Sequence, residues 1–147
     1  MAGPTTAPAG ADTRIAAVAA VLLLIGMPIG WLTDNPSSGD VIGMIVITLI
    51  MLGLMAAIFL RLIPRQLAAA DGVNRPARTG LILGIVALVT CVVFWTGLPF
   101  PLGAGAVALG LAGRELAPRA GDGGRATAAV VLGALAVLLA FVGLLVG

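Results

Sequence analysis

Residues 79–113 read TGLILGIVALVTCVVFWTGLPFPLGAGAVALGLAG and decide the architecture of the chain. The stretch is about 35 residues long and uncharged, so as one straight helix it would measure about 52 Å at 1.5 Å per residue. The hydrocarbon core of a bilayer is only about 30 Å thick. The segment Gly97 to Pro101 offers a break, because its two prolines lack amide donors and push the preceding residues out of the α region. The sequence therefore predicts a helical hairpin with arms at residues 79–96 and 102–113.

The composition places the whole chain in a membrane. Hydrophobic residues make up 61% and charged residues only 10%, whereas soluble domains are usually about 45–50% apolar. The predicted fold is an all-α, polytopic integral membrane bundle of four to five transmembrane helices that includes the Pro/Gly-turned hairpin. The net charge of +2 does not indicate nucleic acid as a partner, because basic residues are needed beside membrane spans.

Three further apolar runs flank the hairpin, at residues 15–32, 41–63 and 126–146. The first could be a secretory signal, but its roughly 18 residues exceed the usual apolar region of about 7–15 and no small-residue cleavage site follows. We therefore interpret it as a retained span. The second run is predicted to end at Arg61, Pro64 and Arg65.

The chain divides into three parts by composition. Residues 1–13 are mostly Pro, Ala, Thr and Gly and are predicted to be a disordered tail. Residues 14–77 form a two-span N-terminal helical pair. Residues 78–147 form the hairpin and the final span.

The distribution of charge predicts an orientation. With five crossings, all eight arginines fall on one side, and the other side holds Asp34 and Asp40 without a base. The positive-inside rule makes the arginine side cytoplasmic, with the N-terminus inside and the C-terminus outside. A single crossing of residues 79–113 would place the arginine clusters on opposite sides and remove the asymmetry. Length and charge thus both favour the hairpin.

The returning arm of the hairpin leaves an alternative open. Residues 102–113 give about 18 Å of helix, which is short of the hydrocarbon thickness. A re-entrant hairpin, which keeps the same sidedness without a full crossing, would need its turn to be buried in protein or water.

Small residues recur at one-turn spacing along the spans, and such pairs let helices approach closely where lipid offers no hydrophobic gain. They could serve packing within the chain, or an interface with a membrane protein partner or a second copy. The bilayer itself is the other predicted partner. The pairs are Gly80/Gly84, Ala106/Gly110, Ala129/Gly133, Ala136/Ala140 and Gly143/Gly147.

The polar side chains within the spans point to structural roles. They are threonines and a single cysteine, and hydroxyls in helices usually bond a preceding backbone carbonyl. An intramembrane ionisable group, which a transporter or pump normally needs, is missing from the predicted spans. The residues are Thr48, Thr90, Cys91, Thr96 and Thr127.

The sequence predicts no catalytic residue, no cofactor-binding residue and no metal ligand, and therefore no enzyme and no cofactor. It contains no His and a single Cys. Asp34 and Asp40 could in principle bind a cation, but solvated turn residues are the better interpretation. The segment from Gly121 to Arg125 lacks the preceding strand and the lysine of a phosphate-binding loop.

The chain from Arg78 onward resembles the family of small bacterial membrane domains called domain of unknown function 4190. The resemblance rests on the segment from Gly80 to Ile85, on a Gly/Ala-rich arm from Gly105 to Arg114, and on Gly123 to Gly133, which includes a charged, Gly-rich loop and the start of the last arm. It covers about 70 of the 147 residues. It implies a bacterial membrane protein and carries no implied activity.

Together these features predict a non-enzymatic structural or accessory component of a bacterial inner membrane. The alternative is a small transporter or channel that works as an oligomer.

Overall fold

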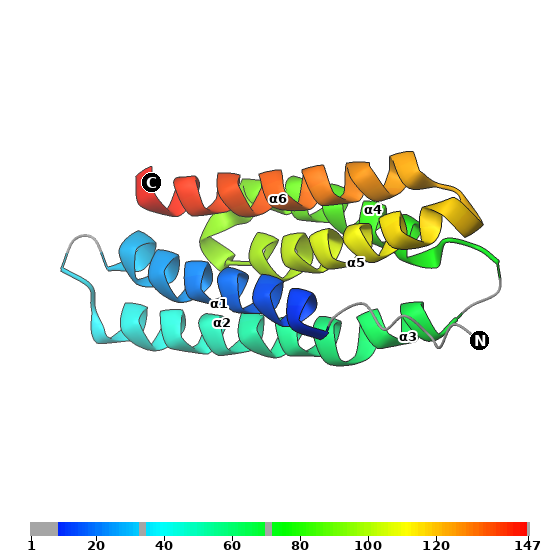
Figure 1. Cartoon of the computed structure of the whole chain (residues 1–147). Helices are drawn as coiled ribbons and strands as arrows, with labels where there is room; N and C mark the ends of the chain where they lie inside the picture. Colours follow the sequence, from blue (N-terminus) through cyan, green and yellow to red (C-terminus); the bar gives the residue numbers. More distant parts are fainter. Residues whose placement is uncertain (1–8, 33–34, 70–71, 147) are drawn as a thin grey trace.

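The computed structural model describes residues 9–32, 35–69 and 72–146, and all of their regular structure is helical (Figure 1). This confirms the all-α prediction. A π-helical turn, η1, joins α2 to α3, and a 3-10 segment, η2, follows α4. The elements in order are α1 (Ala9–Trp31), α2 (Ser38–Ala57), η1 (Ile58–Leu62), α3 (Ile63–Ala68), α4 (Arg75–Thr90), η2 (Cys91–Thr96), α5 (Pro99–Ala120) and α6 (Gly123–Val146).

Four helical segments in the described part of the chain are long and apolar enough to cross a membrane, which supports a multi-pass membrane protein. Large aliphatic side chains cover their outer faces, including Leu49 on α2, Val89 on α4 and Leu138 on α6, each at least half exposed. Such faces suit contact with lipid. The four segments are Asp12–Trp31, Ser38–Ala68, Arg75–Thr96 and Gly123–Val146.

Helix α5 is a fifth long helix of the bundle and is not among those four candidate spans. It runs antiparallel to α4 and α6 and lies against both (Figure 1). More than half of its residues are buried, most of them Gly and Ala. A helix that other helices cover meets little lipid, so it can be built from small residues of modest hydropathy.

The turn of the hairpin is tighter than predicted, and the returning arm is longer. Only Gly97 and Leu98 separate η2 from α5, and Gly97 has a left-handed φ of 72°. Pro99 and Pro101 lie in the first turn of α5, where a missing amide hydrogen leaves no helical bond unmade. With 22 residues, α5 is about 33 Å long at 1.5 Å per residue. Its uncharged part, Pro99–Gly113, measures only about 22 Å, and the rest of the helix contains Arg114, Glu115 and Arg119. The apolar part of the arm therefore remains shorter than the hydrocarbon core of about 30 Å.

The helix of the second span continues past Arg61, Pro64 and Arg65, where the span is predicted to end. The helix continues through η1 into α3 and ends only at Ala68. In a regular α-helix, Pro64 could not bond the carbonyl of Leu60 and its ring would clash with it. The π turn removes this conflict by widening the helix, and the amide of Ile63 donates to the carbonyl of Ile58 five residues back.

The predicted tail at residues 1–13 extends too far along the chain. Helix α1 already begins at Ala9, so residues 9–13 are helical, and Asp12 lies in the first turn, where a negative charge is favourable beside the helix dipole. Residues 1–8 lie outside the described residues. The N-terminal boundary of α4 at Arg75 likewise precedes the predicted division at residue 78.

The small-residue pairs are packed inside the chain. Gly80 and Gly84 of α4 face Leu109 and Leu132, and Gly143 faces the ring of Phe94. Ala106, Gly110, Ala129, Gly133, Ala136 and Ala140 are all buried. These contacts correspond to the first predicted role, packing within one copy. Gly147 lies outside the described residues.

Candidate functional site at the arginine-bearing end

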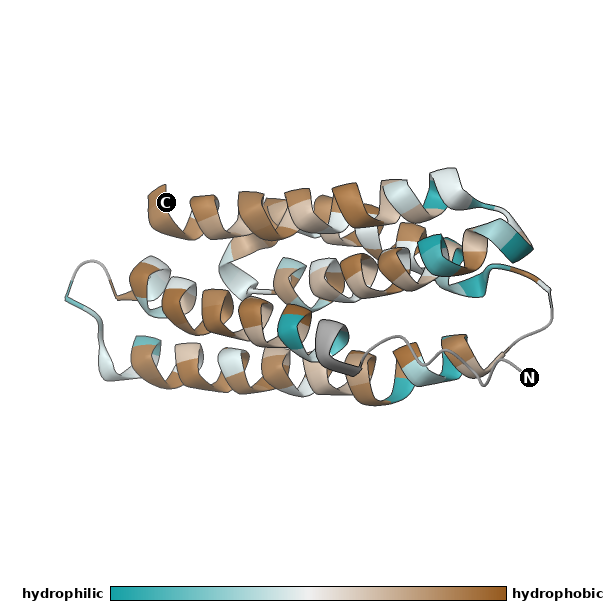
Figure 2. Ribbon diagram, viewed as in Figure 1, coloured by the Kyte–Doolittle hydropathy of each residue, from teal (hydrophilic) through white to brown (hydrophobic). Residues whose placement is uncertain are grey.

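Hydrophilic residues gather at one end of the bundle (Figure 2). Helix α3 ends there, α4 and α6 begin there, and α5 ends there (Figure 1). This topology brings together arginines that are far apart in the sequence: Arg65, Arg75, Arg78, Arg114, Arg119 and Arg125.

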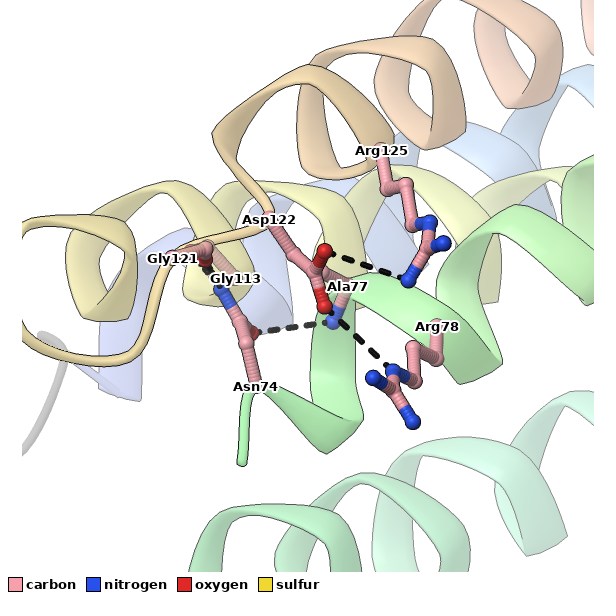
Figure 3. Close-up of polar contacts among 7 residues, drawn as sticks. All are labelled: Asn74, Ala77, Arg78, Gly113, Gly121, Asp122 and Arg125. Carbon is pink, nitrogen blue, oxygen red and sulfur yellow. Dashed lines mark hydrogen bonds and ion pairs between the residues drawn. The ribbon is translucent and has the colours of Figure 1, made fainter. Parts of the chain in front are cut away.

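Asn74 is the centre of this end (Figure 3). Its side chain is fully buried, and no other polar side chain among the described residues is classed as buried. The Oδ1 atom accepts from the amide of Ala77 at 3.2 Å and so caps α4. The Nδ2 atom donates to the carbonyls of Gly113 at 2.7 Å and Gly121 at 2.8 Å. One side chain thus ties the start of α4 to the middle and the end of α5.

Two arginines flank this centre on the surface (Figure 3). The Nε atom of Arg78 lies 3.3 Å from one carboxylate oxygen of Asp122, and a terminal guanidinium nitrogen of Arg125 lies 3.1 Å from the other. Both arginine side chains are more than half exposed. Exposed pairs of this kind contribute little to stability, typically about 0–1 kcal/mol. Asp122 thus neutralises part of the positive charge of this end.

A shallow polar pocket of about 470 Å³ lies beside the first turn of α4. Its lining combines Arg75 and Arg78 with Gln66, Val73 and Thr79, and the hydroxyl of Thr79 lies 3.1 Å from the Oε1 atom of Gln66. Guanidinium groups at the membrane-facing end of a bundle can contact anionic lipid headgroups. The described residues contain no group of three His, Cys, Asp or Glu side chains that could hold a metal ion.

The polar side chains predicted to be structural do bond backbone carbonyls. Thr48 donates to Met44, Thr90 to Ala87, Thr96 to Val93 and Thr127 to Gly123, at 2.7–3.0 Å. The thiol of Cys91 lies 3.4 Å from the carbonyls of both Ala87 and Ala136, so it bridges the end of α4 to α6.

The opposite end carries the two tryptophans and the capped start of α2. The indole nitrogen of Trp31 donates to the carbonyl of Trp95 at 2.8 Å, which joins α1 to η2. Asp40 is exposed, as predicted, but it lies in the first turn of α2 and forms a capping box with Ser37, so it is a helix residue and not the predicted turn residue. Asp34 lies outside the described residues.

Sequence reasoning missed Asn74. The run Asn74-Arg75-Pro76 carried the signal, because an Asn followed by an early Pro is typical of a helix start. Its tertiary contacts to Gly113 and Gly121 had no signal in the sequence.

Comparison of the chain with protein-family models, with curated proteins and with solved structures gave no match. The resemblance to domain of unknown function 4190 therefore stays a prediction.

Proposed function

We propose that this chain is a non-enzymatic structural or accessory component of a bacterial inner membrane. The observation that carries the proposal is the close packing along α5. A Cβ atom at Gly133 would lie 2.5 Å from the carbonyl oxygen of Gly103, and one at Gly110 would lie 2.8 Å from the carbonyl oxygen of Ala126. Backbones in such contact leave no room for a solute path between α5 and α6 within one copy.

The proposed orientation places the arginine-bearing end in the cytoplasm. The positive-inside rule supports it, because arginines beside membrane spans are retained on the cytoplasmic side. The tryptophan pair at the other end suits a membrane interface, and because aromatic residues are enriched at both interfaces it marks the edge of the membrane without indicating the side. The N-terminus then lies inside and the C-terminus outside.

A small oligomeric transporter or channel is the alternative. Because α5 and α6 are in backbone contact, such a pathway could not run between these two helices and would have to use the outer faces of the bundle or the space between copies. The outer faces of α2 and α4 carry large aliphatic side chains, such as Ile42, Leu49, Ile82 and Val89. These side chains suit lipid better than a hydrated path, which favours the structural or accessory role.

The test is purification of the tagged full chain at native expression level in nanodiscs, followed by mass determination and identification of co-purifying proteins. We expect one copy with a stoichiometric membrane protein partner. A homo-oligomer that transports a solute in proteoliposomes would instead establish the alternative, and catalytic turnover by the purified chain would refute a non-enzymatic role.

A further inference from the structure

A groove of about 390 Å³ runs along α1, with α6 as its other wall and α5 as its floor. The volume lies within the range of about 300–1,000 Å³ that is typical of ligand pockets. Val18 and Leu22 line it from α1, Val107 from α5, and Ala134 and Val137 from α6. Arg14 is the single charged residue of the lining. The groove is therefore apolar along its length and cationic at one point.

The groove exists because α1 diverges from α6 toward the arginine-bearing end. Near the other end the two helices touch, and a Cβ at Gly30 would lie 2.6 Å from Leu144. Toward the arginine-bearing end, Ile15 instead packs against a buried cluster of η1, α3 and α5 that consists of Ile58, Ile63, Ala108 and Leu109. Helix α1 also starts well short of the points that α3 and α5 reach at that end (Figure 1).

Arg14 lies deeper in the membrane than the other arginines of this end, because it sits only a short distance along α1 from Trp31. From Arg14 to Trp31 the helix rises about 26 Å, and Trp31 marks the opposite interface. The hydrocarbon core is about 30 Å thick, so the Cα of Arg14 lies near or within its edge. A guanidinium at that depth must extend to the interface or meet an anion there.

The residues that the structure describes do not supply that anion to Arg14. The Arg14 side chain is exposed and forms no ion pair with any residue that the structure describes. Asp12, two residues earlier, is turned about 200° around the helix axis. It lines a separate groove beside α2, with Phe59 and Leu60.

We propose that this groove is a binding site for an anionic phospholipid, with an acyl chain between α1 and α6 and the phosphate on Arg14. The apolar walls match the acyl chain, and a guanidinium binds phosphate with two parallel hydrogen bonds. Basic pockets between transmembrane helices are known positions for anionic headgroups. A zwitterionic lipid brings its own ammonium and leaves less net charge for Arg14 to neutralise. The proposal depends on membrane insertion and not on the identity of a protein partner.

The test is native mass spectrometry of the full chain after exchange into micelles that contain phosphatidylglycerol or phosphatidylcholine as probes. We expect one phosphatidylglycerol to be retained preferentially. Arg14→Gln should lower its affinity about fivefold, the effect of about one basic residue at a membrane surface, and Arg14→Lys should keep most of it. Ala134→Phe, which fills the groove, should lower retention of the same lipid.

Two matched variants control for position and bulk. Arg119→Gln removes an exposed arginine at the same end, and Val131→Phe enlarges an exposed side chain of α6; neither residue lines the groove. Both should retain the lipid as the unmodified chain does. Equal retention by all variants, or equal retention of the two lipids, would overturn the proposal and leave only a non-specific lipid annulus. Thermal unfolding of each variant establishes that the fold is intact.

Discussion

The side-chain amide nitrogen of Asn74 lies 2.7 Å from the carbonyl oxygen of Gly113 and donates a hydrogen bond to it. The two residues are 39 positions apart in the sequence. They can meet because Gly113 has no side chain: a Cβ there would lie 2.9 Å from the Cα of Ala77, one turn into α4. The polar tie and the close approach of α4 and α5 are therefore two parts of one contact.

Replacing Asn74 with alanine should strongly destabilise the protein. The change removes partners from the Gly113 and Gly121 carbonyls and from the Ala77 amide, and a buried group without a partner costs about 1–3 kcal/mol. We expect a loss of about 3 kcal/mol or more, measured by unfolding in one fixed detergent with tryptophan fluorescence. Asp122→Asn at the same end should cost less than about 1 kcal/mol, because it breaks only exposed ion pairs. Similar losses for the two variants would show that Asn74 has no special role.

A glycine pair tests whether packing along α5 is as close as the structure has it. Gly133→Ala should destabilise the bundle, because the new Cβ would lie 2.5 Å from the Gly103 carbonyl oxygen and 2.9 Å from the Ala106 side chain. Overpacking of this kind typically costs about 1–3 kcal/mol. Gly53→Ala on α2 meets nothing within 4 Å, and it should be neutral or stabilise the helix by about 0.5–1 kcal/mol. The same unfolding assay distinguishes them, and stabilisation by both would contradict the packing.

Packing of the hairpin turn on α1 can be tested by comparing Gly97 with Gly72, a second glycine with a left-handed backbone conformation. Gly97→Ala combines backbone strain at a φ of 72° with a contact of 2.7 Å to the Leu23 side chain. Gly72→Ala has the same strain at a φ of 75° and an open surrounding. Left-handed backbone costs an alanine about 1–2 kcal/mol, so Gly72→Ala should lose about that amount of unfolding free energy. Gly97→Ala should lose clearly more, and equal losses would mean that the turn does not pack on α1.

The sequence was sufficient for the hairpin because length and charge are properties that any helical arrangement must satisfy. Residues 79–113 were too long for one crossing, and the arginines could share a side only if the chain turned back. Local rules misplaced the ends of helices where Pro64, Pro99 and Pro101 occur. Each of these prolines was interpreted as a break, and each is accommodated inside a helix by a π turn or by a place in the first turn.

Features that depend on tertiary contacts could not be predicted from the sequence. The groove beside Arg14 depends on the divergence of α1 from α6, which the close approach at Gly30 and the packing of Ile15 determine together. The burial of Asn74 likewise depends on carbonyls from the distant residues Gly113 and Gly121. Hydropathy and helical periodicity carry no information on either contact.

The last prediction concerns the sidedness of the hairpin, in a Cys91→Ser background that keeps a hydrogen-bond donor at that position. Ser38 and Arg119 are exposed at opposite ends of the bundle, and Leu98 lies half-buried in the hairpin turn. In intact cells, a membrane-impermeant maleimide should label Ser38→Cys and Leu98→Cys. It should label Arg119→Cys only after the membrane is permeabilised.

Phe100→Cys provides the control for burial. Phe100 is fully buried against other helices, so a thiol there should resist labelling from both sides even though α5 crosses. If Ser38→Cys reacts from outside while Leu98→Cys reacts from neither side, the turn lies within the membrane and the hairpin is re-entrant. If Arg119→Cys reacts in intact cells, the arginine-bearing end faces outward and the proposed orientation is wrong. Labelling of Leu98→Cys from outside together with Arg119→Cys from inside requires a full crossing, because α5 is the helix that connects the two positions.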